Sequence, residues 1–203
     1  MRGLSVLVMI LSLTGCVISS PQRVQYNAEY SNRQDIHSHT LYRFMVKPIK
    51  SSGEKYWGAG DLTELFYVKG DAASSVELHL DYASKSMTVK SIDSQNKTLD
   101  VEKYILLDES DEKPSDSNVK YIYLTKDGEL IRKVKNCTPD MSVACQWWDH
   151  RIFITHNGDL AVQYQQGAVG MLFLLVPFYG NRSYLEIFPG VSSRSILHDG
   201  KST

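Results

Sequence analysis

Cys137 and Cys145 are the residues of this chain whose spacing most clearly predicts a covalent bond. The segment between them contains Pro139-Asp140, which favours a turn and lets the two thiols approach each other. Two cysteines in an oxidising compartment usually pair. We therefore predict a structural disulfide, which stabilises so short a loop by about 2 to 3 kcal/mol in the chain-entropy model.

The alternatives for these cysteines are a metal site and a redox pair. Zinc is usually bound by four ligands, and the nearby His150 and His156 lie at a spacing unlike that of a zinc finger. A redox pair normally has the Cys-x-x-Cys spacing, which the sequence lacks. Trp147-Trp148 begins two residues after Cys145. We expect this pair to pack over the disulfide as part of the core, with a carbohydrate or peptide platform as the alternative.

Other patterns that could do chemistry are weak. His37-Ser38-His39 places two imidazoles on one side of a strand, but a metal would need further ligands from elsewhere. The acidic segment 108–118 lacks the alternating Asp, central Gly and final Glu of a calcium loop. No nucleophile elbow, metalloprotease motif or phosphate loop is present in the sequence. The sequence therefore predicts no metal, no cofactor and no enzymatic activity.

Residues 1–15 differ from the rest of the chain in charge and hydropathy. Arg2 supplies a positive charge, and residues 4–13 are almost purely aliphatic. This run is too short for a membrane-spanning helix, which needs about 20 apolar residues. Small residues follow it in place of a basic flank, so the pattern predicts a signal peptide that is removed by processing.

The segment Leu13-Thr14-Gly15-Cys16 resembles the lipobox of bacterial lipoprotein precursors, in which a leucine and two small residues precede the lipidated cysteine. The resemblance covers residues 1–16. It implies a diacylglycerol thioether on Cys16, cleavage after Gly15, and a third acyl chain, such as palmitate, on the new amine. Several acyl chains hold a protein firmly on a membrane, whereas one binds only reversibly. The alternative is an ordinary secretory signal in which Cys16 is incidental.

The same resemblance implies a location in the bacterial cell envelope. Val17, and not Asp, follows the cysteine, which in enteric-type bacteria implies transfer to the outer membrane, whereas a periplasmic domain is expected for the folded part of the chain in either membrane. The chain as a whole has 203 residues, 42% of them hydrophobic, which fits one globular domain or at most two small ones. Its formal net charge of -1 provides no field that would attract nucleic acid, so we expect no nucleic-acid partner.

Alternation of polar and apolar residues predicts strands over residues 75–80, 87–92 and 99–107, with a turn at 81–85. The acidic segment 108–118 then predicts a solvated loop. Two hairpins follow, one through Asp127-Gly128 and one through Asn157-Gly158, because glycine takes a positive φ in such turns without steric cost.

These elements predict an all-β or mainly β domain, an antiparallel sandwich or meandering barrel with one disulfide. No long stretch has the periodicity of an amphipathic helix. The expected organisation is a signal peptide over 1–15, a lipidated flexible tether over 16–35, the β domain over 36–195 and a tail over 196–203. The tether is expected because residues 17–35 are mostly polar.

An apolar run over residues 168–179 departs from the alternating pattern. It is too short to span a bilayer, and Pro177 interrupts it. One interpretation is a hairpin whose first strand is buried on both faces. The other is a surface that contacts a protein partner or the membrane, and its contact residues would be Met171, Leu172, Phe173, Leu174 and Leu175.

Two functions remain open from the sequence. The leading hypothesis is a membrane-anchored, non-enzymatic envelope lipoprotein whose β domain binds or braces a protein partner in an immunity, inhibitory, exclusion or assembly role. The alternative is a lipid-anchored carrier or sensor, since small barrels can enclose an apolar ligand. The N-terminal lipid links both to a membrane.

Overall fold

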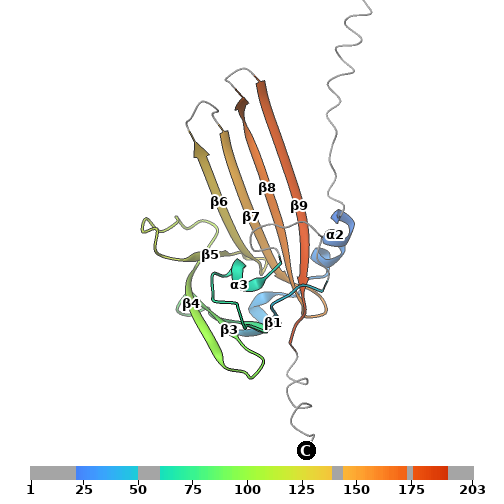
Figure 1. Cartoon of the computed structure of the whole chain (residues 1–203), viewed down its shortest axis with the longest axis vertical. Helices are drawn as coiled ribbons and strands as arrows, with labels where there is room; N and C mark the ends of the chain where they lie inside the picture. The colour runs from blue at the N-terminus through green and yellow to red at the C-terminus, as the bar shows by residue number, and fades with distance from the viewer. Residues whose placement is uncertain (1–21, 50–59, 139–143, 173–175, 192–203) are drawn as a thin grey trace, which may run out of the picture.

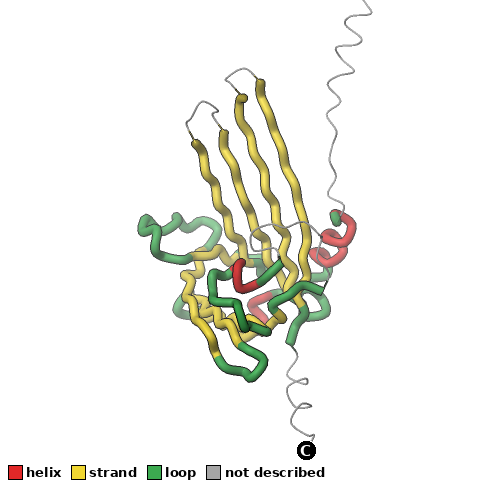
Figure 2. The backbone as a smooth tube through the Cα atoms, viewed as in Figure 1, coloured by secondary structure: helices red, strands yellow, loops and turns green. Residues whose placement is uncertain are grey.

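The computed structural model describes residues 22–49, 60–138, 144–172 and 176–191. In this part of the chain a nine-stranded sheet follows the order of the sequence, each strand lying next to the preceding one (Figures 1 and 2). All neighbouring pairs are antiparallel except β4 and β5, which are parallel. The mainly β fold with one disulfide is therefore confirmed. The strands are β1 (Leu41–Met45), β2 (Ser75–Asp81), β3 (Ser86–Ile92), β4 (Thr98–Leu107), β5 (Tyr121–Leu124), β6 (Leu130–Thr138), β7 (Ala144–Ile154), β8 (Leu160–Leu172) and β9 (Val176–Phe188).

The sheet closes on itself where β1 meets the residues that follow β9. The Met45 backbone N–H donates to the Pro189 carbonyl at 2.8 Å, and the Val191 N–H donates to the Arg43 carbonyl at 2.8 Å. These bonds join the first strand to the segment that directly follows the last strand. A meandering sheet that closes on itself therefore describes the fold better than a sandwich of two packed sheets does.

Apolar side chains from all parts of the meander fill the closed end. A short helix, α3 (Leu62–Leu65), covers part of it. The Asp61 side chain caps α3 by accepting a hydrogen bond from the Thr63 backbone N–H at 2.8 Å. The largest fully buried side chains are Phe44, Phe66, Phe153, Phe188, Ile36, Leu62, Leu65, Leu78, Leu80, Met87, Ile122 and Leu130.

Both predicted hairpins are present, and their turns are built alike. Thr125 and Thr155 begin the turns, and the Oγ1 atom of each accepts from the backbone N–H four residues later at 3.1 Å. Gly128 and Gly158 adopt φ values of 74° and 85°, the left-handed region that favours glycine. The Asp-Gly and Asn-Gly signals thus identified the β5–β6 and β7–β8 connections correctly.

The predicted strands at 75–80, 87–92 and 99–107 correspond to β2, β3 and β4. The acidic segment after β4 is an exposed connection, as expected, and Lys85 Nζ donates to Asp108 Oδ2 at 2.7 Å. This connection is long enough to carry the chain back along β4 before β5 begins. The result is one parallel pair, with Ile105 opposite Tyr121, within a sheet that is otherwise antiparallel.

The prediction of a flexible tether over residues 16–35 is wrong for residues 22–35. They contain the helix α2 (Arg23–Ser31), which a 3-10 turn, η1 (Ile36–Ser38), follows. Tyr26 and Tyr30 share one face of α2 and pack edge-on against Phe153 of β7, with ring centroids 6.1 and 5.5 Å away. Two aromatic residues in an otherwise polar segment were too weak a pattern to predict this contact. The signal peptide, residues 16–21 and the tail over 196–203 lie outside the described residues.

Beyond the closed end, the last four strands continue as a long extension (Figure 1). We call it the blade and define it as residues 133–138, 144–149, 165–172 and 176–183. Its register is continuous, from Lys133 opposite Asp149 to Thr138 opposite Ala144 and from Gln165 opposite Ser183 to Leu172 opposite Val176. The blade therefore carries the same hairpins outward, past the core that supports them.

Candidate functional site

The blade presents two faces, because successive side chains of a strand point to opposite sides. The inner face continues the core side of the sheet and carries Trp148 opposite Gln166. The outer face lies on the side of α2 and carries Trp147 opposite Gly167. The sequence placed both tryptophans in the core, but each is only half-buried and they lie on opposite faces. That prediction is wrong, because the sheet separates adjacent residues.

Apolar side chains are exposed on both faces of the blade. Val134 on the inner face is 39% exposed, and Val169 and Tyr179 on the outer face are 45% and 71% exposed. Single exposed apolar residues are ordinary, but a group of them on one projection is typical of an interaction surface. Val169 and Tyr179 belong to the apolar run of residues 168–179, so burial on both faces does not describe these two positions.

Of the five predicted contact residues, the structure places the backbone of Met171 and Leu172, at the far end of the blade. Met171 and Leu172 are the last residues of β8, and Val176 begins β9 opposite Leu172. Phe173, Leu174 and Leu175 lie outside the described residues, as do the side chains of Met171 and Leu172. The backbone thus confirms a hairpin at this run and places it at the end of the blade, and the predicted contact stays a prediction.

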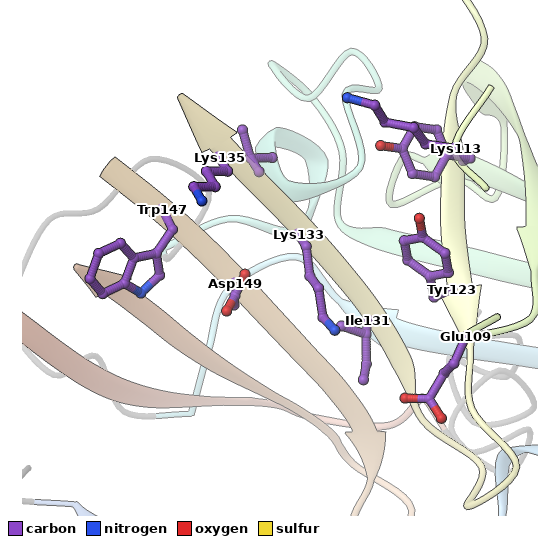
Figure 3. Close-up of a pocket in the computed structure, with 10 residues that line it drawn as sticks. Glu109, Lys113, Tyr123, Ile131, Lys133, Lys135, Trp147 and Asp149 are labelled. Atoms are coloured by element: carbon purple, nitrogen blue, oxygen red, sulfur yellow. The ribbon is translucent and has the colours of Figure 1, made fainter. Parts of the chain in front are cut away.

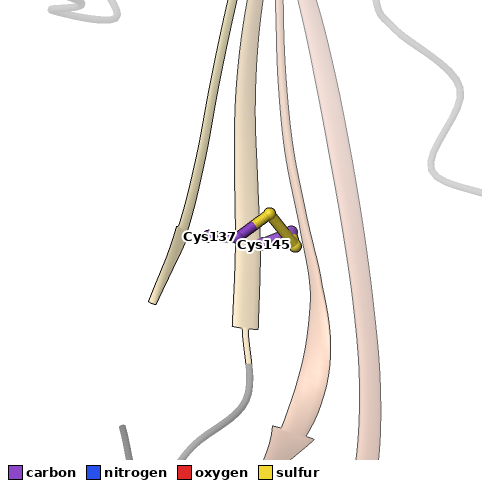
Figure 4. Close-up of a disulfide and its surroundings, with 2 residues drawn as sticks. All are labelled: Cys137 and Cys145. Carbon is purple, nitrogen blue, oxygen red and sulfur yellow. A yellow bond between two sulfur atoms is a disulfide. The ribbon is translucent and has the colours of Figure 1, made fainter. Parts of the chain in front are cut away.

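The Cys137–Cys145 disulfide joins directly opposed residues of β6 and β7 on the outer face (Figure 4). Their Cα atoms are 4.0 Å apart. The disulfide that the sequence predicted is therefore present. It links the two strands of one hairpin close to its end, where the core no longer contributes packing.

A groove of about 580 Å³ lies on the outer side of β5, β6 and β7, at the foot of the blade (Figure 3). The segment after β4 supplies Glu109 and Lys113 to one wall. The rest of the lining combines basic, aromatic, aliphatic and acidic side chains. It comprises Tyr121, Tyr123, Ile131, Lys133, Val134, Lys135, Trp147 and Asp149. Such a mixture favours a polar, charged partner over a purely apolar one.

Charge in the groove is unevenly balanced. Burial raises the pKa of the Asp149 carboxyl, although the nearby Lys133 and Arg151 oppose this effect. Among the described residues, Lys113 and Lys135 have no ion-pair partner within 4.0 Å. The groove therefore offers basic groups that the protein itself leaves available.

Sequence reasoning missed these lysines, although a signal for them existed. Cys137 pairs with Cys145, and residue numbers in an antiparallel pair add to a constant. Counting back from the disulfide places Lys135 opposite Trp147 and Lys133 opposite Asp149, as the observed register does. A predicted disulfide between two predicted strands can therefore predict which side chains share a groove.

Glu129, in the turn between β5 and β6, connects α2 to the sheet. Its carboxylate is buried and lies 3.2 Å from Arg33 Nε and 3.4 Å from Arg151 Nε. The Arg33 guanidinium stacks over the Tyr30 ring, 4.1 Å from the centroid, a favourable cation–π geometry. We call Glu129, Arg33, Arg151 and Tyr30 the clasp, because together they fix the N-terminal helix to β6 and β7.

The histidines in the described part of the chain do not assemble a chemical site. His37 Nδ1 lies 2.6 Å from Asp35 Oδ1 and His39 Nδ1 lies 2.8 Å from Ser38 Oγ, so the predicted pair serves local turns. His150 is buried under the blade, and its ring packs edge-on against Tyr164 with centroids 5.0 Å apart. Burial, with Arg132 nearby, lowers the pKa of His150 to about 4, which keeps it neutral. The described residues contain no group of three or more His, Cys, Asp or Glu that could hold a metal ion.

Comparison with protein-family models, with curated proteins and with solved structures finds no match to this chain. Within the described ranges, no helix has both the length and the apolar character required to cross a bilayer. Nothing among the described residues indicates an enzymatic activity. The blade and the groove at its foot are therefore the features from which a function has to be argued.

Proposed function

We propose that this protein is a non-enzymatic lipoprotein of the bacterial cell envelope whose blade binds a protein partner. The observation that supports this most directly is the exposure of Val134, Val169 and Tyr179 on an extension that leaves the core. A long, paired and disulfide-linked extension is costly to maintain unless it contacts something, because its strands gain little from burial. A protein surface is the partner whose apolar and polar groups would match such a blade.

The described grooves support this role better than they support a carrier of a small apolar ligand. The groove at the foot of the blade is lined by three lysines and two carboxylates. A second groove, beside α3, is lined by Lys47, Asp61, Glu64 and Asp71 among others. Pockets for small apolar ligands are lined mainly by apolar and aromatic side chains.

Site-specific photocrosslinking in intact cells tests the proposal. A photoreactive amino acid at Tyr179 should form a covalent adduct with one or a few proteins, identified by mass spectrometry. The control is the same amino acid at Val101 of β4, an exposed apolar residue outside the blade, at 45% exposure against 71% for Tyr179. We expect the adduct from position 179 and not from position 101.

Three other results would count against the proposal. Identical protein adducts from both positions would indicate non-specific contact, and no protein adduct from position 179 would leave the blade without a partner. Adducts with lipid alone would assign the blade to the membrane. A bound apolar small molecule, detected by native mass spectrometry, would support the carrier role instead.

A further inference from the structure

The edge of β6 is unpaired along most of its length. β5 pairs with β6 only at Tyr123 opposite Ile131 and Leu124 opposite Leu130. β6 continues to Thr138, and within the described chain no strand pairs with its free side from Arg132 onward. A free strand edge presents backbone N–H and C=O groups that another strand can bind.

Open space borders this edge on both sides of the sheet. The groove of about 580 Å³ lies against its outer side and includes Lys133 and Val134. A third groove, of about 280 Å³, is also lined by Lys133 and Val134, together with Ser117 and Val119 from the connection that leads into β5. An added strand would have room beside β6 in the position that β5 leaves vacant.

The other edge of the sheet is formed by β9. At the foot of β9, the Gln22 side chain donates to the Leu185 carbonyl at 3.0 Å and accepts from the Leu185 N–H at 2.7 Å. Ile49 N–H also donates to the Ile187 carbonyl at 2.7 Å. The chain thus covers both edges at the foot of the blade, β9 with Gln22 and Ile49 and β6 with β5. Along the blade, the charged groove distinguishes the edge of β6.

The charge beside β6 indicates what would bind there. Lys133 and Lys135 are exposed and point to the outer side, and Lys113 faces them across the groove. Lysines on an edge strand repel the same edge of a second copy, so two blades would not pair through β6. They attract a strand that carries carboxylates.

We propose that the free edge of β6 binds an extended acidic segment of a partner protein, which adds to the sheet as a further strand. This rests on the proposed function and specifies how the partner is held. Glutamate or aspartate at alternate positions of the segment would face Lys133 and Lys135 on the outer side. The intervening positions would be apolar, because they would lie beside Val134 on the inner side.

A synthetic peptide with four glutamates alternating with three valines, capped at both ends, is the probe. Fluorescence anisotropy should detect its binding to the mature domain, and hydrogen exchange should slow at the backbone amides of residues 132–138. Reversing both lysine charges (Lys133→Glu with Lys135→Glu) should weaken binding at least about tenfold, since each opposite-charge pair contributes a few-fold. The same variant should bind the corresponding lysine–valine peptide.

The control for net charge is Lys97→Glu with Lys103→Glu, which reverses two exposed lysines near β4. We expect it to bind the acidic peptide as the native protein does. The control for edge pairing is the acidic peptide with its alternate backbone amides methylated, which keeps the charges and removes the donors. We expect this peptide not to bind.

Two outcomes would overturn the proposal. Equal binding of the methylated peptide would mean that no strand is added. Displacement of the acidic peptide by oligogalacturonate, with tighter binding of the saccharide than of the peptide, would identify the groove as a site for an acidic carbohydrate. The Tyr179 crosslink is read separately: if the Lys133→Glu, Lys135→Glu variant still forms the protein adduct, the blade retains its partner and only the proposal for the β6 edge fails.

Discussion

Glu129 is the residue on which the N-terminal helix most depends. It stands in the β5–β6 turn, is 2% exposed and lies within ion-pair distance of both Arg33 and Arg151. Removing one partner of a buried ion pair destabilises a protein by more than the intact pair stabilises it, because the remaining charges are left without compensation. Here two arginines would be left facing each other beside Tyr30.

We therefore expect Glu129→Gln to lower the free energy of unfolding by about 1 to 3 kcal/mol, a value reduced from that of a fully buried pair because both arginines are partly exposed. Urea unfolding followed by circular dichroism measures the change. Glu109→Gln, at an exposed position on the connection after β4, should change stability by less than about 0.5 kcal/mol. Equal effects of the two substitutions would show that the clasp contributes nothing of its own.

The disulfide acts at the scale of one element, the β6–β7 hairpin. The Leu130 end of the hairpin is part of the core, whereas Cys137 and Cys145 lie far out in the blade. A hairpin that is isolated from a core is marginal in water. The cross-link compensates for that by restricting the unfolded hairpin.

Replacing both cysteines with serine should therefore loosen the outer hairpin and leave the closed end unchanged. Hydrogen exchange should accelerate by a factor of about ten or more in the outer part of the hairpin, at residues 134–138 of β6 and 144–148 of β7. Loop closure contributes at most about 2 to 3 kcal/mol to the stability of the hairpin, which limits the size of this effect. Exchange in β2 and β3 provides the internal control and should stay constant. Uniformly faster exchange in all strands would mean that the disulfide supports the whole domain.

The sequence was most informative where local chemistry determines an element. Gly128 and Gly158 each mark a turn that only a positive φ can close, and the alternation around Val76, Leu78 and Leu80 identifies β2 because those residues fill the core. These are short-range signals. They are sufficient for strands, for hairpins and for the disulfide that one hairpin brings together.

Signals that depend on the packing of distant segments were missed. α2 is stable because Tyr26 and Tyr30 meet Phe153, which lies more than a hundred residues away in the sequence. The groove likewise forms because the acidic connection carries Lys113 to the side of β6. Nothing in either segment by itself reveals its neighbour, so the N-terminal helix and the groove could only be found once the whole sheet was assembled.

At the scale of the whole molecule, the folded N-terminus changes what the lipid anchor would do. A tether of residues 16–35 would have let the domain stand well away from the bilayer. With α2 fixed to the sheet by the clasp, only residues 17–21 separate Cys16 from Gln22, whose side chain is hydrogen-bonded to Leu185. A fully extended chain of that length spans at most about 20 Å, so the anchor we propose would hold the domain close to the membrane.

Cys16→Ser tests the anchor and its independence from the fold. We expect the variant to leave the membrane fraction and appear in the soluble envelope fraction, because its acyl chains supply the membrane affinity. Its circular dichroism spectrum and urea midpoint should match those of the native protein purified without its lipid, since the core and the clasp lie entirely after residue 22. Ser20→Ala, four residues further along, is the matched control and should remain with the membrane.

If the Cys16→Ser protein still sediments with membranes in high salt, the anchoring role passes to the apolar hairpin of residues 168–179. The blade would then point toward the lipid and not toward a partner, and the Tyr179 crosslink should find lipid in place of protein.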